Sequence, residues 1–281
     1  MATQLDLRPS PIAGQWYPAD PRALRSTIES LLADAAVAPP PGEIVGLVAP
    51  HAGYRYSGPV AAQAFKLVAG RHYEHVVVLS PMHHPYSAPL LTTAHDGYAT
   101  PLGSVPVAQD VIAELAARVP LAAVREDPEH SLEIELPFLQ VALDGAFTLT
   151  PLMLRDQSQS AVQRLGDALA AVFGGVENVL LVASSDLSHF YTDREARTLD
   201  RVMLDRVAAF DPAGVLRAEA EQKAFACGRG AIAAMLIAAR GLGADAVEIV
   251  GYGTSGDTSG DRQRVVGYGA AAVTRTGADG G

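Results

Sequence analysis

Three short apolar runs in this sequence each end in a polar cluster, and this pattern constrains the fold more than any other feature. The runs cover residues 43–48, 75–80 and 177–190. Short runs rich in β-branched residues are typical of buried strands. Segments with helical spacing of apolar residues lie between them, and alternating strands and helices indicate a parallel sheet between helical layers. We therefore predict one α/β domain with a central, mostly parallel β-sheet flanked by helices.

The polar residues stand where the predicted strands end. His51 follows the first run and precedes a helix predicted over residues 58–70, and His83 follows the second. Asp186 and His189 close the third. A single histidine in such a place is more often solvated or satisfied in the core. Because open α/β sheets bind ligands at the carboxyl ends of their strands, three such ends together predict a shared site.

Length and composition limit the classes of protein to consider. The chain has 281 residues, a formal net charge of -10 and one cysteine. We predict a single domain over residues 1–281, with residues 1–42 as an arm and helix packed on it and 276–281 as a frayed tail. The acidic balance disfavours nucleic acid, and no apolar stretch is long enough for a bilayer. With no signal-peptide pattern and no pairable cysteines, we expect a cytoplasmic protein.

His51, His83 and Cys227 are residue types that bind first-row transition metals, and each lies next to a predicted turn. Imidazole suits iron, copper and zinc, and a thiolate shifts the preference towards softer ions. The three residues are far apart along the chain and form no local metal-binding motif, so by themselves they are weak evidence for a metal site. For Cys227 the alternative is a small buried hydrophobic residue. A helix predicted just after it would instead lower its pKa and favour the thiolate.

Other patterns suggest different chemistry. Asp186 and His189 stand among serines, as in a hydrolase triad, but the chain lacks the GxSxG nucleophile elbow. His130 lies among acidic residues, which suggests a general base with a raised pKa or, equally, a surface histidine. Residues 251–256 match GxGxxG, but a predicted strand follows instead of the helix that a dinucleotide site requires.

Six motifs together resemble the Memo family, whose bacterial and archaeal members are also called AmmeMemoRadiSam system protein B. The motifs, in the family's order, are APHAGYRYSG, SPMHHPYSAPL, EHSLEIELPFLQ, SSDLSHF, ACGRGAIAAML and GDRQRVVGYGAAAV. The resemblance runs from residue 13 to the last predicted strand. The resemblance implies a fold similar to the class III extradiol ring-cleaving dioxygenases, which use non-heme iron. It also implies a metal site of His51, His83 and Cys227. The same cleft would be lined by His130, Asp186 and His189.

Those dioxygenases hold iron with two histidines and a glutamate, and here Cys227 would replace the carboxylate. We expect iron(II) first, with copper(I) or zinc as alternatives. The function implied is a metal-dependent, dioxygenase-like oxidoreductase for a small organic substrate, with His130, His189 and Asp186 as catalytic groups. The rival is a non-catalytic protein that binds a peptide or ligand in the cleft, or an accessory to radical-SAM and AMMECR-type partner proteins. Hydrolysis by a metal-bound water is a third alternative.

Overall fold

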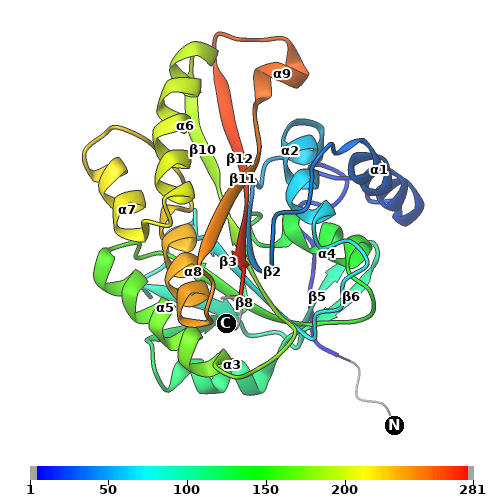
Figure 1. Ribbon diagram of the computed structural model, residues 1–281. Helices are drawn as coiled ribbons and strands as arrows, with labels where there is room; N and C mark the ends of the chain where they lie inside the picture. Colours follow the sequence, from blue (N-terminus) through cyan, green and yellow to red (C-terminus); the bar gives the residue numbers. More distant parts are fainter. Residues whose placement is uncertain (1–4, 278–281) are drawn as a thin grey trace.

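The computed structural model describes residues 5–277, which form two sheets and two layers of helices (Figure 1). Over the described residues the large sheet has nine strands, in the order β10-β12-β2-β9-β3-β8-β4-β7 with β11 paired to β12. Its strands are β2 (Glu43–Ala49), β3 (His75–Pro81), β4 (Leu90–Thr93), β7 (Leu121–Val124), β8 (Thr148–Leu154), β9 (Val179–Ser184), β10 (Asp186–Tyr191), β11 (Ala246–Thr254) and β12 (Val265–Arg275). The small sheet contains β1 (Leu7–Arg8), β5 (Gly97–Thr100) and β6 (Gly103–Pro106).

The centre of the large sheet is parallel. Strands β2, β9, β3 and β8 are neighbours in that order and run in one direction, whereas β12 and β4 flank them antiparallel. Ala49 pairs with Ser184, and Leu79 pairs with Ala183, so β2, β9 and β3 end at a similar level. The predicted α/β domain is confirmed. The three predicted strands lie side by side, within a sheet that is mixed as a whole.

Helices cover both faces of this sheet, and two hydrophobic cores fill the space beneath them (Figure 1). One core joins the sheet to α3 (Gln109–Ala116), α5 (Gln159–Phe173), α6 (Asp193–Ala208), α7 (Pro212–Ala220) and α8 (Arg229–Gly241). The other joins it to α1 (Pro21–Asp34), α2 (Tyr54–Lys66), α4 (Leu136–Ala142) and the small sheet. The short helices η1 (Glu133–Glu135) and α9 (Ser255–Ser259) complete the elements. None of the helices in the described part of the chain is long and apolar enough to cross a bilayer.

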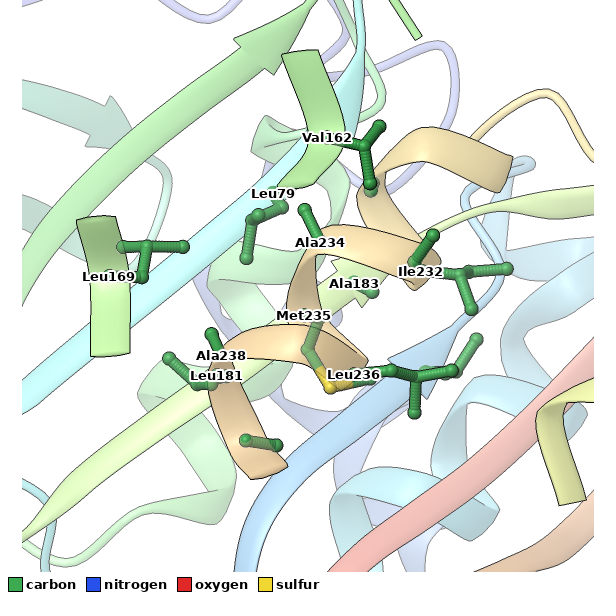
Figure 2. Close-up of a cluster of buried hydrophobic side chains, with 14 of the residues drawn as sticks. Leu79, Val162, Leu169, Leu181, Ala183, Ile232, Ala234, Met235, Leu236 and Ala238 are labelled. Atoms are coloured by element: carbon green, nitrogen blue, oxygen red, sulfur yellow. The ribbon is translucent and has the colours of Figure 1, made fainter. Parts of the chain in front are cut away.

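Helix α8 is buried between α5 and the sheet, and Figure 2 shows the side chains that hold it. The contributing residues are Ile232, Ala234, Met235, Leu236 and Ala238 from α8, Leu79, Leu181 and Ala183 from the sheet, and Val162 and Leu169 from α5. A Cβ on Gly166 would lie 2.5 Å from Ile237 Cγ2, so the two helices approach closely only because Gly166 has none. Close packing of this kind fixes the position of α8, which starts two residues after Cys227.

Helix α2 begins at Tyr54, four residues earlier than the pattern predicted. The prediction placed Pro59 in the first turn, where proline needs no hydrogen-bond donor. Instead Gly53 is the N-cap, and the backbone N–H of Tyr54 donates to Trp16 O at 2.9 Å. His51 therefore lies between the end of β2 and the start of α2 on only a short connection. Such a connection leaves its backbone little freedom.

Both ends of the described chain are attached to the domain. In the N-terminal arm, Leu7 and Arg8 pair with β5, and α1 packs on α2 and α4. At the other end, Thr276 is held by Asp245, whose carboxylate accepts hydrogen bonds from its backbone N–H at 2.9 Å and its hydroxyl at 2.7 Å. The last four residues of the predicted frayed tail, 278–281, lie outside the described residues.

Candidate metal centre

His51, His83 and Cys227 come together at the carboxyl edge of the parallel strands. One ligand atom from each lies within 4.8 Å of the other two. His51 Nε2 is 3.1 Å from Cys227 Sγ, and the rings of His51 and His83 are 5.5 Å apart at 81°. Ligands bound at about 2.0–2.3 Å to one ion lie roughly 3–4 Å from each other. The donor set and its spacing therefore fit a small first-row metal ion.

Ser184 and Asp186 both hold His51, the first at its ring and the second at its backbone. Ser184 Oγ lies 2.9 Å from His51 Nδ1, and Asp186 Oδ1 accepts a hydrogen bond from the His51 backbone N–H at 2.8 Å. The imidazole is 2% exposed. Burial and the neighbouring imidazoles hold the pKa of His51 well below its usual value. The ring is therefore neutral at pH 7, and its Nε2 faces Cys227.

Glu129 is a fully buried carboxylate that holds His83. Its Oε1 lies 2.9 Å from His83 Nδ1, and its Oε2 accepts a hydrogen bond from the His83 backbone N–H at 2.5 Å. The backbone N–H groups of His130 and Ser131 also donate to Oε1, at 2.9 and 3.0 Å. Burial opposes ionisation of Glu129, but these hydrogen bonds prevail and lower its pKa far below the usual value. The same contact outweighs burial at His83 and raises its pKa.

His130 lies against both the site and the N-terminal arm. Its ring stacks on His83 with centroids 5.0 Å apart and lies 4.2 Å from the ring of Trp16. Nδ1 is 3.2 Å from Glu129 Oε1. The expectation of a raised pKa is wrong: burial lowers the pKa of His130 to about 4, and Glu129 offsets this only in part. His130 is therefore a neutral imidazole at pH 7.

Asp186 lies beside His51 and Cys227, but Asp186 and His189 do not form a triad. His189 Nδ1 lies 2.8 Å from the Leu187 carbonyl oxygen, so it donates there. The Asp186 carboxylate faces the His51 backbone instead. Burial raises the pKa of Asp186 to about 7, and the hydrogen bond from His51 moderates that rise. Desolvation also lowers the pKa of His189, although part of the residue is exposed to solvent.

The imidazoles of His51, His83 and His189 are thus hydrogen-bonded through the same ring nitrogen, Nδ1. The Nδ1 atoms of His51, His83, His130 and His189 each lie within 3.2 Å of an oxygen atom. A neutral imidazole that donates through Nδ1 keeps an unprotonated Nε2. His51 therefore presents the lone pair of its Nε2 to the Cys227 thiol, and His83, whose pKa is raised, offers its Nε2 once its second ring proton has left. Such an arrangement suits metal ligation and proton acceptance.

Cys227 lies two residues before the start of α8, at the end of the link from α7. The expectation of a lowered pKa is wrong for the metal-free protein, because burial and the nearby Asp186 carboxyl raise the pKa of Cys227. These effects outweigh the adjacent helix N-terminus. The thiol is therefore protonated, and its Sγ lies 3.1 Å from the His51 Nε2 lone pair. A metal ion would take the place of that proton.

Gly228 is what allows Cys227 to approach the end of β9. Its N–H donates to Ser185 Oγ at 2.9 Å, and an added Cβ would lie 2.3 Å from Ser184 O. We expect Gly228→Ala to cost about 1–3 kcal/mol through overpacking and to reduce metal content by displacing Cys227. Thermal unfolding and metal analysis of the variant check this. A variant with unchanged melting temperature and full metal content would contradict the close approach.

A sequence model described as Memo-like protein matches residues 8–272. The chain belongs to the Memo family. MEMO1 family proteins from Methanopyrus kandleri, Nitrosopumilus maritimus and Methanococcoides burtonii are 35%, 34% and 36% identical to it. These alignments cover 95%, 94% and 95% of this chain and 98%, 98% and 100% of the relatives. An uncharacterized protein of Escherichia coli K12 has a solved structure that aligns with 82% of this chain and 99% of its own, at 15% identity and a TM-score of 0.49.

A buried ion-pair network supports the loop that carries Glu129 in this Memo-family chain. Arg8 Nε and Nη1 lie 2.6 Å from Asp127 Oδ2 and 2.5 Å from Glu133 Oε2. Nη2 donates to the backbone oxygens of Asp127 and Glu129, at 3.0 and 2.6 Å. Tyr17 adds a 2.6 Å hydrogen bond to Glu133. The N-terminal arm thus fixes the segment from which Glu129 reaches His83.

Sequence patterns did not single out Glu129, Ser184, Glu135 or Arg8 as site residues. Each acts through a contact with a residue that is distant along the chain; Arg8, for example, pairs with residues 119 and 125 positions away. The Memo motifs do include three of them: EHSLEIELPFLQ begins with Glu129 and contains Glu135, and SSDLSHF begins with Ser184. Their position beside predicted ligands was the available signal.

Proposed function

We propose that this chain is a metal-dependent oxidoreductase of the Memo family, whose ion is held by His51, His83 and Cys227. The observation that carries the proposal is the approach of these three ligand atoms to within 4.8 Å. The buried oxygen partners of the two Nδ1 atoms support it, because metal-binding histidines are usually oriented in this way. Iron(II) is the first candidate, followed by copper(I) and zinc. A bound ion of this kind would supply redox or Lewis-acid chemistry.

The chain's own residues would bind and orient the substrate and accept protons. His83 is the most exposed of the three ligands, so the site is open on its side. His130 and His189 have lowered pKa values and are neutral at pH 7, as proton acceptors must be. Asp186, with a pKa of about 7, can hold or release a proton close to physiological pH.

A small organic substrate is supported by the residues next to His189. Phe190 is 61% exposed, has a left-handed backbone with φ 67°, and lies in an irregular part of β10. Its ring centroid is 5.7 Å from His189 and 5.2 Å from the Arg264 guanidinium carbon. Exposed aromatic rings and backbone strain are both enriched at binding sites. We also propose that the protein works in the reducing cytoplasm, where its one cysteine would stay reduced and able to bind the metal.

Metal content tests the ligand set. After anaerobic reconstitution with iron(II), the wild type is expected to hold close to one ion per chain, and His51→Ala a small fraction of that. The reason is that removing His51 leaves only two of three ligands. His75→Ala, a change at the far end of β3, serves as the control and should retain the ion. Equal metal content in wild type and His51→Ala would contradict the ligand assignment.

Oxygen uptake separates the oxidoreductase from the rival functions. Iron-loaded wild type and Cys227→Glu are compared on a panel of catechols and other small phenols. Substrate-dependent uptake by the wild type would support the proposal. Uptake by Cys227→Glu alone would show that the site cannot cleave aromatic rings while Cys227 stands in place of the glutamate. No uptake by either, with peptide or radical-SAM partner binding that survives metal removal, would favour a binding protein.

A further inference from the structure

Ser184 Oγ has three hydrogen-bond partners, and they determine where the protons lie. It is 2.9 Å from His51 Nδ1, 2.6 Å from Glu135 Oε1 and 2.6 Å from the Ser131 carbonyl oxygen. A hydroxyl donates one hydrogen and accepts up to two. The Ser131 carbonyl can only accept, so the one Ser184 hydrogen points to it. His51 and Glu135 must then both donate to Ser184.

Glu135 can donate only as a neutral acid. An ionised Glu135 would place a second acceptor 2.6 Å from a hydroxyl whose hydrogen is already used. The side chain is 1% exposed, and Ser184 is its one hydrogen-bond partner among the described residues. Burial and the nearby Asp186 keep the pKa of Glu135 well above its usual value. Geometry and burial therefore agree that the proton is present.

We propose that Glu135 is a positioning residue that keeps its proton and, through Ser184, holds His51 in the Nδ1–H form with Nε2 free for the metal. The inference deepens the proposed metal site and rests on it. Under this proposal, the two histidine ligands differ in the group that holds their Nδ1 atoms. His83 is held directly by the ionised carboxylate of Glu129, whereas His51 is held by a neutral acid through a hydroxyl.

This difference gives opposite expectations for the same substitution. A glutamine amide can donate to Ser184 as the neutral acid does, so Glu135→Gln should keep metal affinity within about threefold of the wild type. Glu129→Gln loses an ionised acceptor and should weaken affinity about 10–100-fold. Glu135→Met removes the donor without adding charge. It should weaken affinity about tenfold, and Ser184→Ala at least as much.

The ring protonation of His51 is measured independently of any metal. In metal-free protein labelled with nitrogen-15, two-bond proton–nitrogen spectra are expected to show His51 protonated at Nδ1 in the wild type and in Glu135→Gln. Ser184→Ala, which removes the acceptor of the His51 Nδ1–H, should show a mixture of both tautomers. Glu135→Gln should lose one of the infrared bands of protonated carboxyls seen in the wild type, and the band of Asp186, whose pKa is about 7, should remain. Thermal unfolding confirms that each variant is folded.

Three results would overturn the proposal. These are an unchanged His51 tautomer in Ser184→Ala, a wild-type spectrum with no carboxyl band assignable to Glu135, and an affinity loss in Glu135→Gln as large as in Glu129→Gln. If the wild type bound no metal, the proposed function would fail by itself. The tautomer and infrared measurements would still decide the role of Glu135.

Discussion

Glu129→Gln is expected to lower metal affinity by about 10–100-fold while the fold is retained. The carboxylate fixes His83 through both the ring Nδ1 and the backbone N–H, and it also anchors the start of the His130–Ser131 segment. An amide keeps the size of the group but removes its charge and one of its two acceptor atoms. Competition with a chromophoric chelator measures the affinity. Affinity falls in Glu129→Gln because the Nδ1–H of His83 loses its ionised partner and the ring is no longer held in the orientation that the metal requires.

The exposed Glu126 on the same loop provides the matched control, and Glu126→Gln should bind metal as the wild type does.

The lowered pKa of Glu129 also fixes a pH dependence of folding stability. Its contribution is present above the unfolded pKa of about 4.5 and is lost as the pH falls towards the folded pKa. The stability difference between wild type and Glu129→Gln should therefore shrink below about pH 4.5. A difference that grew on acidification would contradict an ionised, hydrogen-bonded Glu129.

Arg8→Met is expected to destabilise the protein by about 3–5 kcal/mol, because it leaves buried carboxylates without their cation. The Arg8 side chain is 1% exposed, and those of its partners Asp127 and Glu133 are 1% and 0% exposed. Denaturant unfolding measures the change. The exposed pair of Arg118 and Glu114 is the control, and Arg118→Met should cost about 0.3–0.5 kcal/mol. Equal small losses in both variants would mean that the buried network does not stabilise the arm.

The centre of the fold and the approach of His51 to His83 could be predicted from sequence because both follow from local patterns. Apolar runs of strand length identified β2, β3 and β9, and the ends of adjacent parallel strands must lie at one edge of a sheet. His51 and His83 follow such ends directly. Cys227 needed the family resemblance, because it precedes a helix instead of following a strand.

The residues that support the ligands could not be predicted in this way. Which acceptor meets a histidine Nδ1 depends on side chains from segments that only the folded chain brings together, as with Ser184 and Glu135 beneath His51. The pKa values of Cys227 and His130 depart from expectation for a related reason. Neighbouring charges and helix ends are visible in a sequence, but the extent of burial, which decides both shifts, is not.

X-ray absorption spectroscopy of the zinc-loaded protein tests the central claim most directly, since it reports the atoms bound to the ion. With His51, His83 and Cys227 as ligands, the spectrum should contain one sulfur at about 2.3 Å and nitrogen scatterers with imidazole character at about 2.0–2.1 Å. The sulfur contribution should disappear in Cys227→Ser. A wild-type spectrum that contains only nitrogen and oxygen neighbours, with no sulfur, would contradict the site.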